Sequence, residues 1–301
     1  MKRDLASKKS PAADPKARNG TILAQVRGQP ARTWPVGTRV EEVLEADTSP
    51  EGLAYMGALV NNDGVSLSFA LEVNCTVTPI TLQDHTGYRI YRRSLSFLLA
   101  KVVREHFPKV LFRIEHSIGT GFYCTFERDA EGITPSEIQR IEKGLRTLVE
   151  RNVPIARSKL SYGDALEQFE AEAQQDKHNL LRFRNPPFIA VYSCEDFSDL
   201  AHGVMAARTG MLPYFALHAY HTGFVIQFPG RDDPRRLPDF ADQPELFEIF
   251  KEHKRWGRIL GLSTVGQLNE KIATGDVGRF IHIAEALHEK KIAEIADRIS
   301  S

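Results

Sequence analysis

The stretch RRSLSFLLAKVVREHFP, residues 92–108, has the clearest periodicity in the chain. Apolar residues recur in it at intervals of three and four: Leu95, Leu98, Leu99, Val102 and Val103. This spacing predicts an amphipathic helix that buries these five side chains and ends near Pro108. At about 100° per residue, the opposite face carries Arg93, Phe97, Ala100 and Arg104. We expect that face to look into a cleft.

Upstream of this helix, short strand-like segments surround one short helix between residues 20 and 82. Strands around a single helix in about 60 residues are typical of a small β-grasp domain. Thr38, with Glu41 three residues later, predicts a capping box at the start of that helix.

Downstream, Thr134 and Glu137 predict a second capping box, and GTGFY at residues 119–123 predicts a hairpin or a bulge. After Pro229 a Pro-, Arg- and Asp-rich segment indicates a linker, followed by helices. The last helix has an apolar stripe that needs a partner, or the chain's own second domain, to cover it. Earlier in this helical part, KEHKRW at residues 251–256 has a composition typical of RNA contacts, although on a helix it first indicates a solvated face with Trp256 buried.

The composition is that of an ordinary soluble chain. The 301 residues hold 39 Lys+Arg, 39 Asp+Glu and 42% hydrophobic residues, which excludes disordered, collagen-like and membrane-embedded classes. Three widely spaced cysteines argue against a disulfide framework and favour a reducing cytoplasm. We therefore expect a cytoplasmic protein with no membrane partner. Residues 1–19 carry six basic and two acidic side chains with few apolar ones, which predicts a disordered basic tail.

Several catalytic motifs are missing from the sequence. It contains no G-x-x-x-x-G-K-[ST], no GxSxG and no HExxH. We therefore expect no phosphoryl transfer by a P-loop within this chain.

Four blocks carry a resemblance to known families: TVTPITLQDHTGYRIYRRSLSFLLAKVVREHFP, IEHSIGTGFYCTFE, ITPSEIQRIEKGLRTLVERNVPI and FSDLAHGVMAARTG. Together they resemble the N-terminal half of threonyl-tRNA synthetase, a TGS domain followed by an editing domain. The chain resembles bacterial uridine kinase-like nucleoside kinases more closely, including their segment FPGRDDPRRLPDF. In that family a P-loop kinase domain would begin beyond Ser301.

The resemblance implies an α+β fold with four parts. They are a tail (1–19), a TGS β-grasp domain (20–82), an editing-like domain (83–230), and a linker with C-terminal helices leading toward an absent kinase domain (231–301).

The editing domain of the synthetase uses His-x-x-x-His and Cys-x-x-x-His pairs that converge on one cleft. The resemblance places these pairs on four positions of this sequence: Arg93, Phe97, Ala201 and Met205. None of the four offers an imidazole or a thiolate, so we expect no metal and no corresponding deacylation.

Two interpretations of the altered cleft stay open. In the first, it binds a nucleotide or structured RNA through an Arg92–Arg93 anion clamp, with Phe97 as the stacking surface and four rim residues: His116, Tyr123, His202 and Arg208. In the second, Phe97 and Met205 fill the space and Arg93 pairs with a carboxylate such as Asp199.

The resulting functional hypothesis is a non-catalytic accessory or regulatory module that binds nucleotide or structured RNA such as tRNA, beside a P-loop nucleoside kinase in cis or in trans. One alternative is a metal-independent trans-editing aminoacyl-tRNA deacylase in which His116 or His202 activates water held by Arg93. Another is the N-terminal part of an ATP-dependent uridine kinase. The chain itself is expected to need no cofactor, and ATP with Mg²⁺ only if a kinase domain follows.

Overall fold

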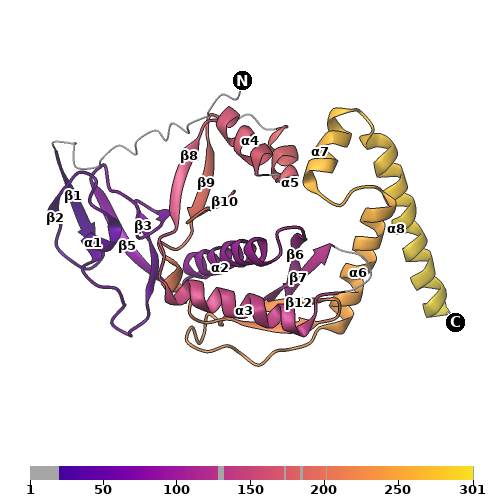
Figure 1. Ribbon diagram of the computed structural model, residues 1–301, viewed down its shortest axis with the longest axis horizontal. Helices are drawn as coiled ribbons and strands as arrows, with labels where there is room; N and C mark the ends of the chain where they lie inside the picture. Colours follow the sequence, from indigo (N-terminus) through magenta and orange to yellow (C-terminus); the bar gives the residue numbers. More distant parts are fainter. Residues whose placement is uncertain (1–19, 128–131, 173, 184–185, 201, 301) are drawn as a thin grey trace, which may run out of the picture.

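The computed structural model describes residues 20–127, 132–172, 174–183, 186–200 and 202–300. The expected basic tail lies outside these residues. The fold is α+β, with three sheets and a helical C-terminal segment. A five-stranded sheet forms one end of the molecule and the last three helices form the other, with a long helix between them (Figure 1).

The five-stranded sheet has the order β2-β1-β5-β3-β4. Its strands are β1 (Thr21–Val26), β2 (Arg32–Pro35), β3 (Tyr55–Val60), β4 (Asp63–Val65) and β5 (Cys75–Thr81). Only the central β1–β5 pair is parallel, as in a β-grasp sheet. Alternate residues of β1 are buried and pack with helix α1 (Val40–Leu44).

The expected capping box at Thr38 does not form. The N-cap of α1 is Arg39, which makes no capping hydrogen bond through its side chain. The Thr38 hydroxyl instead donates to the carbonyl of Pro35 at 2.8 Å, which stabilises the turn before the helix.

Helix α2 (His85–His106) confirms the periodicity that predicted it, since each of its five stripe residues is at most 1% exposed. It begins directly against the end of β5. A Cβ on Gly87 would lie 1.8 Å from the carbonyl oxygen of Thr81, so only glycine allows this close approach. The opposite face is not open along its length, because Phe97 is only 4% exposed and packs on Phe197 at 5.2 Å between ring centroids.

Two further sheets flank α2. One has the order β11-β12-β7-β6 and consists of β6 (Leu111–Ile118), β7 (Gly121–Glu127), β11 (Ala216–Tyr220) and β12 (Gly223–Gln227). The other has the order β10-β9-β8 and consists of β8 (Ala156–Leu160), β9 (Ile189–Cys194) and β10 (Phe197–Leu200). Helices α4 (Tyr162–Ala171) and α5 (Gln175–Leu181) share a core with β8 and β9.

Two local predictions in this region are confirmed. Helix α3 (Pro135–Glu150) starts with the capping box, in which Thr134 accepts from the Glu137 amide and the Glu137 carboxylate accepts from the Thr134 amide. Ile118 pairs with Gly121, so a two-residue turn with Gly119 at φ 53° closes the β6–β7 hairpin.

The segment after Pro229 is tied to both neighbouring sheets. Arg231 donates to the carbonyl of Gln83, and Arg235 donates to the carbonyls of Glu51 and Gly52. Farther along, Phe240 stacks on His218 of β11 with centroids 4.9 Å apart. These contacts make the expected linker a strap between the β-grasp sheet and the four-stranded sheet.

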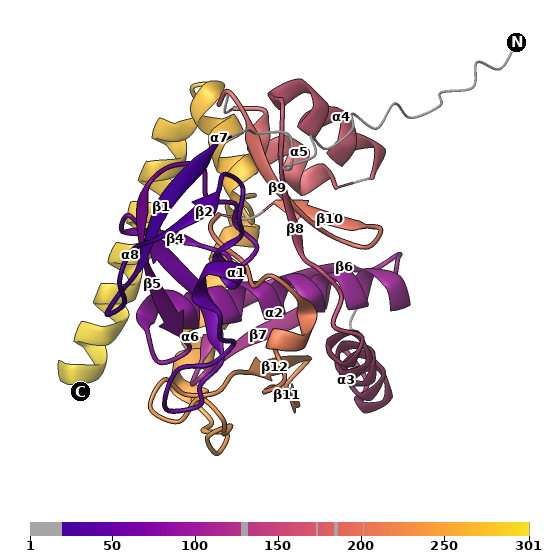
Figure 2. The same ribbon diagram turned by 90° about the vertical axis from the view of Figure 1, so that its left-hand side faces the viewer.

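Helices α6 (Pro244–Ile259), α7 (Val265–Ala273) and α8 (Val277–Ser300) complete the chain. In Figure 1 they form the orange-to-yellow side of the molecule, and Figure 2 shows α8 extending past the sheets. Among the residues that the structure describes, no helix combines the length and apolar character needed to cross a membrane.

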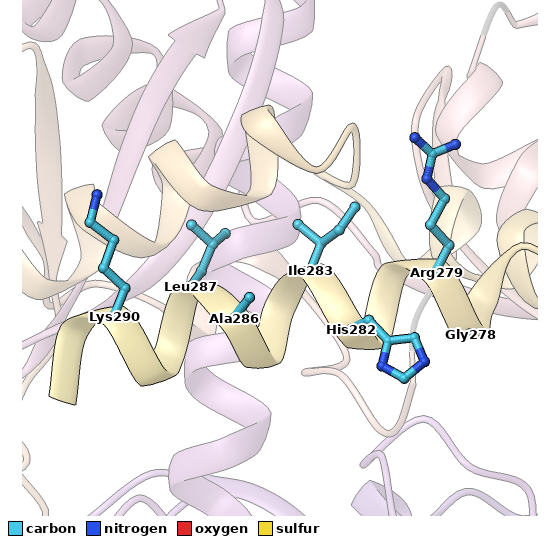
Figure 3. A pocket seen from close by; sticks show the side chains of 7 residues that line it. All are labelled: Gly278, Arg279, His282, Ile283, Ala286, Leu287 and Lys290. Atoms are coloured by element: carbon cyan, nitrogen blue, oxygen red, sulfur yellow. The ribbon is translucent and has the colours of Figure 1, made fainter. Parts of the chain in front are cut away.

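Helix α8 has no buried residue among those described, and Ile292, Ile295 and Ile299 are 55%, 48% and 81% exposed. Ile283 and Leu287 project from one side of it, between Arg279 and Lys290 (Figure 3). The chain's own domains therefore leave much of the apolar stripe uncovered, and an external partner for it stays a prediction.

Candidate functional site

A cleft of about 1090 Å³ lies between the five-stranded sheet and strands β8 and β9. One wall is formed by the segments around Arg39 and Phe69, and the other by Arg157 and Lys159 of β8 and Tyr192 of β9. Residues on the segment after β10 also line it: Gly203, Val204, Ala207 and Arg208. The cleft thus joins residues that are more than 100 positions apart in the sequence.

The cationic side chains of this cleft differ in how far they are neutralised. Arg208 forms an ion pair with Glu41, and Arg39 lies 3.7 Å from the same carboxylate. Arg157 and Lys159 have no carboxylate partner within the described parts of the chain. The Nζ atom of Lys159 lies 4.5 Å from the ring centroid of Phe188, a half-exposed cation–π pair.

Arg93 of α2 is not itself a lining residue of the cleft, but it contacts Gly203 and Val204, which are. Its Nη1 donates to the carbonyl of Val204 at 2.6 Å, and the guanidinium fills the space beside Gly203. Burial lowers the pKa of Arg93 and the nearby cation of Arg89 lowers it further, while Tyr192 opposes both. No carboxylate among the described residues pairs with Arg93. A half-buried cation without an anion favours an anionic ligand.

The expected pairing of Arg93 with Asp199 is wrong. Asp199 bonds Lys177 at 2.9 Å instead, and burial raises the pKa of its carboxyl although Lys177 opposes the rise. The interpretation that Phe97 and Met205 fill the space is confirmed. Phe97 and Met205 are 4% and 2% exposed and belong to one hydrophobic core, so Phe97 offers no free ring face for stacking. Ala201 lies outside the described residues.

Arg92 and Arg93 do not form a clamp. Neighbouring residues on a helix point about 100° apart, and Arg92 lies over Phe122 of β7 with its Cζ 4.2 Å from the ring centroid. Tyr88 and Phe228 surround the same guanidinium at 5.2 and 5.5 Å. Arg92 therefore stabilises the packing of α2 on the four-stranded sheet.

The expected rim residues fall in three places. Arg208 lines the cleft, and His202 is exposed next to Gly203. His116 and Tyr123 lie elsewhere, in a separate hollow between the β6–β7 hairpin and α6. The cleft and this hollow share no lining residue, so the expected grouping of His116 and Tyr123 with Arg93 is wrong.

Buried hydroxyl groups hold the segment after β10 against the helices. The Ser94 hydroxyl of α2 accepts from the Ala206 amide at 2.8 Å. Thr209, at the start of the short helix η2 (Thr209–Met211), donates to the carbonyl of Leu148 at 2.7 Å and accepts from the Val153 amide at 2.9 Å. Such satisfied buried contacts fix the backbone at Gly203 and Val204 relative to Arg93.

Sequence reasoning missed Arg157, Lys159, Tyr192 and Gly203 as cleft residues. The signal for the first two is the alternation in ARSKL, because residues two apart on a strand share a face. No group of three or more His, Cys, Asp or Glu side chains within the described residues is placed to hold a metal. The expectation of a metal-free cleft stays a prediction.

No protein-family model matches the chain. Its homologues are N-terminal regions of threonine–tRNA ligases at about 30% identity. The chain is 32% identical to the threonine–tRNA ligase of Desulforamulus reducens over 242 residues, which is 76% of this chain and 37% of the relative. It is also 32% identical to the ligase of Maridesulfovibrio salexigens over 226 residues, which is 70% of this chain and 34% of the relative. The ligase of Finegoldia magna is 27% identical over 232 residues, 71% of this chain and 36% of the relative.

The chain thus spans little more than a third of the length of these relatives. They bear out the resemblance to the synthetase. They give no support to the closer resemblance to nucleoside kinases, nor to a kinase partner.

Proposed function

We propose that this chain is a tRNA-binding module whose cleft holds the single-stranded 3′ end of a tRNA. The module does not hydrolyse the bond between the tRNA and its amino acid. The relatives are named as ligases that act on tRNA, which is why tRNA is the RNA proposed. The observation that carries the proposal is the uncompensated Arg93 behind a cleft walled by Arg157 and Lys159.

Charge and shape support a nucleic-acid strand as the ligand. Arg157 and Lys159 lie on the same face of β8, two residues and therefore about 7 Å apart along the strand. This spacing is close to that between successive phosphates of a nucleic-acid strand. Phe69 lines the opposite wall with 40% of its surface exposed and offers an aromatic surface for a base. The binding is expected to weaken steeply with salt, because cations that neutralise phosphates release counterions.

Apart from His202, the side chains expected beside Arg93 support binding rather than hydrolysis. Hydrolysis needs a group that accepts a proton within hydrogen-bond reach of the attacking water. The side chains of Phe97 and Met205 are packed in the core, and the imidazole of His116 lines a different hollow. Arg93 itself stays protonated near neutral pH.

The test is a filter-binding titration with intact tRNA and with the same tRNA lacking its 3′ single strand. We expect the double variant Arg157→Gln/Lys159→Gln to weaken binding of intact tRNA by about tenfold or more, since two phosphate contacts are lost. Lys109→Gln, at an exposed lysine between α2 and β6, is the matched control and should bind normally. Equal binding of intact and trimmed tRNA would contradict the proposal.

A metal-independent deacylase is the second candidate. It is favoured by the exposed imidazole of His202 beside Gly203, the one expected base that lies next to the cleft. Incubation with seryl-tRNA and other mischarged tRNAs distinguishes the two functions. Hydrolysis that is lost in His202→Ala establishes the deacylase, whereas binding without release of the amino acid supports the module.

Neither function requires a kinase domain or ATP. A cytoplasmic location, where charged tRNA is present, belongs to the same proposal. The absence of a cofactor also stays a prediction.

A further inference from the structure

The hollow that holds His116 and Tyr123 has features of a ligand site of its own. Its volume is about 560 Å³, which falls in the range of small-molecule pockets of roughly 300–1,000 Å³. Strands β6 and β7 form one wall, and helix α6 with the turn that follows it forms the other. Since it shares no lining residue with the cleft, this site is independent of the proposed tRNA contact.

Aromatic side chains come from both walls. The ring of Phe250 on α6 stacks on His116 of β6, with centroids 3.7 Å apart and planes inclined by 14°. Phe247 meets Tyr123 of β7 edge-on at 5.1 Å. Aromatic groups gathered in this way offer a planar ligand both stacking and edge contacts.

The acidic groups of the hollow are already neutralised. Glu115 forms an ion pair with Lys254 and accepts from the Thr125 hydroxyl at 2.8 Å. Burial acts to raise the pKa of Glu115, but these contacts outweigh it and hold the pKa below its ordinary value. Glu127 pairs with Arg113 at 2.8 Å.

One cation in the hollow is free of such a partner. Arg258, at the C-terminal end of α6, pairs with no carboxylate in the described ranges of the chain. With both acidic side chains matched, Arg258 leaves the hollow with a net positive charge, which favours an anion.

His116 supplies an unsatisfied polar atom. Its Nε2 is buried and has no hydrogen-bond partner, although buried polar atoms in native proteins nearly always have one. Burial lowers the pKa of His116, and Lys254 lowers it further against the opposing effect of Glu115, so the imidazole is neutral at pH 7. A neutral imidazole provides one donor and one acceptor, as hydrogen bonding to a heterocyclic base requires.

We propose that this hollow binds a nucleotide, with the base among Phe250, His116 and Tyr123 and the phosphate at Arg258. Hydroxyl groups for the ribose are present in the lining, from Thr222 and Ser263. A base, a sugar and a phosphate account together for the aromatic wall, the hydroxyls and the unpaired cation. The nucleotide is either a free mononucleotide or one nucleotide of an RNA strand.

Calorimetric titration of the full chain tests the proposal with AMP and UMP. Adenosine lacks the phosphate and ribose 5-phosphate lacks the base, so each removes one of the two contacts. A single-stranded RNA tetranucleotide distinguishes the free nucleotide from an RNA source. We expect at least one mononucleotide to bind about tenfold or more tightly than either fragment, given the cost of losing a charge-assisted or a stacking contact.

Two variants locate the site. Arg258→Gln should weaken mononucleotide binding about tenfold while leaving adenosine binding unchanged, because only the phosphate contact is lost. Arg255→Gln is the matched control, since Arg255 is an exposed arginine on the same helix that does not line the hollow. Phe250→Leu should weaken the mononucleotide and adenosine alike, and its thermal unfolding midpoint shows whether the fold is kept.

Three results overturn the proposal. The first is the absence of calorimetric binding by both mononucleotides and by the tetranucleotide. The second is equal weakening in Arg258→Gln and Arg255→Gln. The third is binding of the tetranucleotide alone that is lost in Arg157→Gln/Lys159→Gln, which would assign the contact to the cleft. Loss of tRNA binding with mononucleotide binding intact leaves this inference standing and removes only the proposed function.

Discussion

The guanidinium of Arg93 occupies the space that a side chain on Gly203 would need. A Cβ at Gly203 would lie 2.7 Å from Cζ and from Nη1 of Arg93. Gly203 also has φ 138°, a backbone conformation that side-chain-bearing residues rarely adopt. The segment that lines the cleft and the cation on α2 are therefore fitted to each other.

Gly203→Ala is expected to destabilise the protein by about 1–3 kcal/mol, through backbone strain and displacement of Arg93. It should also weaken tRNA binding, because a side chain at this position displaces the Arg93 guanidinium. Urea unfolding measures the first effect and filter binding the second. Gly163→Ala is the control, because a Cβ there meets nothing within 4 Å and alanine suits helix α4. Equal stability of the two alanine variants would contradict the fit.

Arg92→Met and Arg93→Met should affect different properties, the first stability and the second tRNA binding. Arg92→Met is expected to lose about 0.5–2 kcal/mol of stability with tRNA binding unchanged, because it removes the cation over Phe122. Arg93→Met should weaken tRNA binding, since it removes the uncompensated charge at the cleft. Unfolding and binding curves for both variants test this. Reduced binding in both would restore the paired clamp that the sequence suggested.

Tyr91→Phe should destabilise the protein by about 1–2 kcal/mol, since two backbone groups lose a partner. The Tyr91 hydroxyl donates to the Tyr214 carbonyl at 2.9 Å and accepts from the Tyr214 amide at 2.8 Å. Burial raises the pKa of Tyr91 well above its ordinary value, so the hydroxyl stays protonated. Tyr88→Phe is the comparison, because the Tyr88 ring packs under Arg92. Equal midpoints for the two variants would contradict the role of the hydroxyl.

Lys101 predicts a specific pH dependence of stability. Its side chain is 1% exposed and its Nζ lies 3.2 Å from Glu195 and 3.0 Å from Asp196, with Glu105 also in contact. Burial opposes the charge of Lys101, but the carboxylates outweigh it and raise the pKa of the ammonium. Lys101 also lowers the pKa of Asp196, and for Glu195 the contacts with Lys101 and Arg151 together overcome the effect of burial.

Carboxyl groups with a lowered folded-state pKa stabilise the fold above their unfolded pKa of about 4, and this contribution is lost as the pH falls through the folded value. The stabilisation from the raised pKa of Lys101 is lost only on the alkaline side. Wild-type protein should therefore lose more stability between about pH 5 and pH 3 than Lys101→Met, measured by urea unfolding. Parallel pH profiles for the two proteins would contradict the coupling.

Local sequence patterns predict much of the secondary structure. The apolar spacing from Leu95 to Val103 identified α2, and the Thr134–Glu137 pair located the start of α3. Thr38 does not cap α1 because its hydroxyl donates to the carbonyl of Pro35. Residue types alone do not show which of these two contacts the hydroxyl makes. The composition of the segment after Pro229 predicts a linker, because it does not show which carbonyls Arg231 and Arg235 bind.

The sequence by itself determined which chemistry three of the expected site positions lack, since Arg93, Phe97 and Met205 have no imidazole or thiolate whatever their surroundings. Only the tertiary structure decided where the candidate ligand-binding residues lie. Arg92 packs against Phe228 whereas Arg93 donates to Val204, and His116 and Tyr123 face α6 because the four-stranded sheet packs there. Periodicity acts over a few residues, whereas these positions depend on contacts between segments more than 100 residues apart.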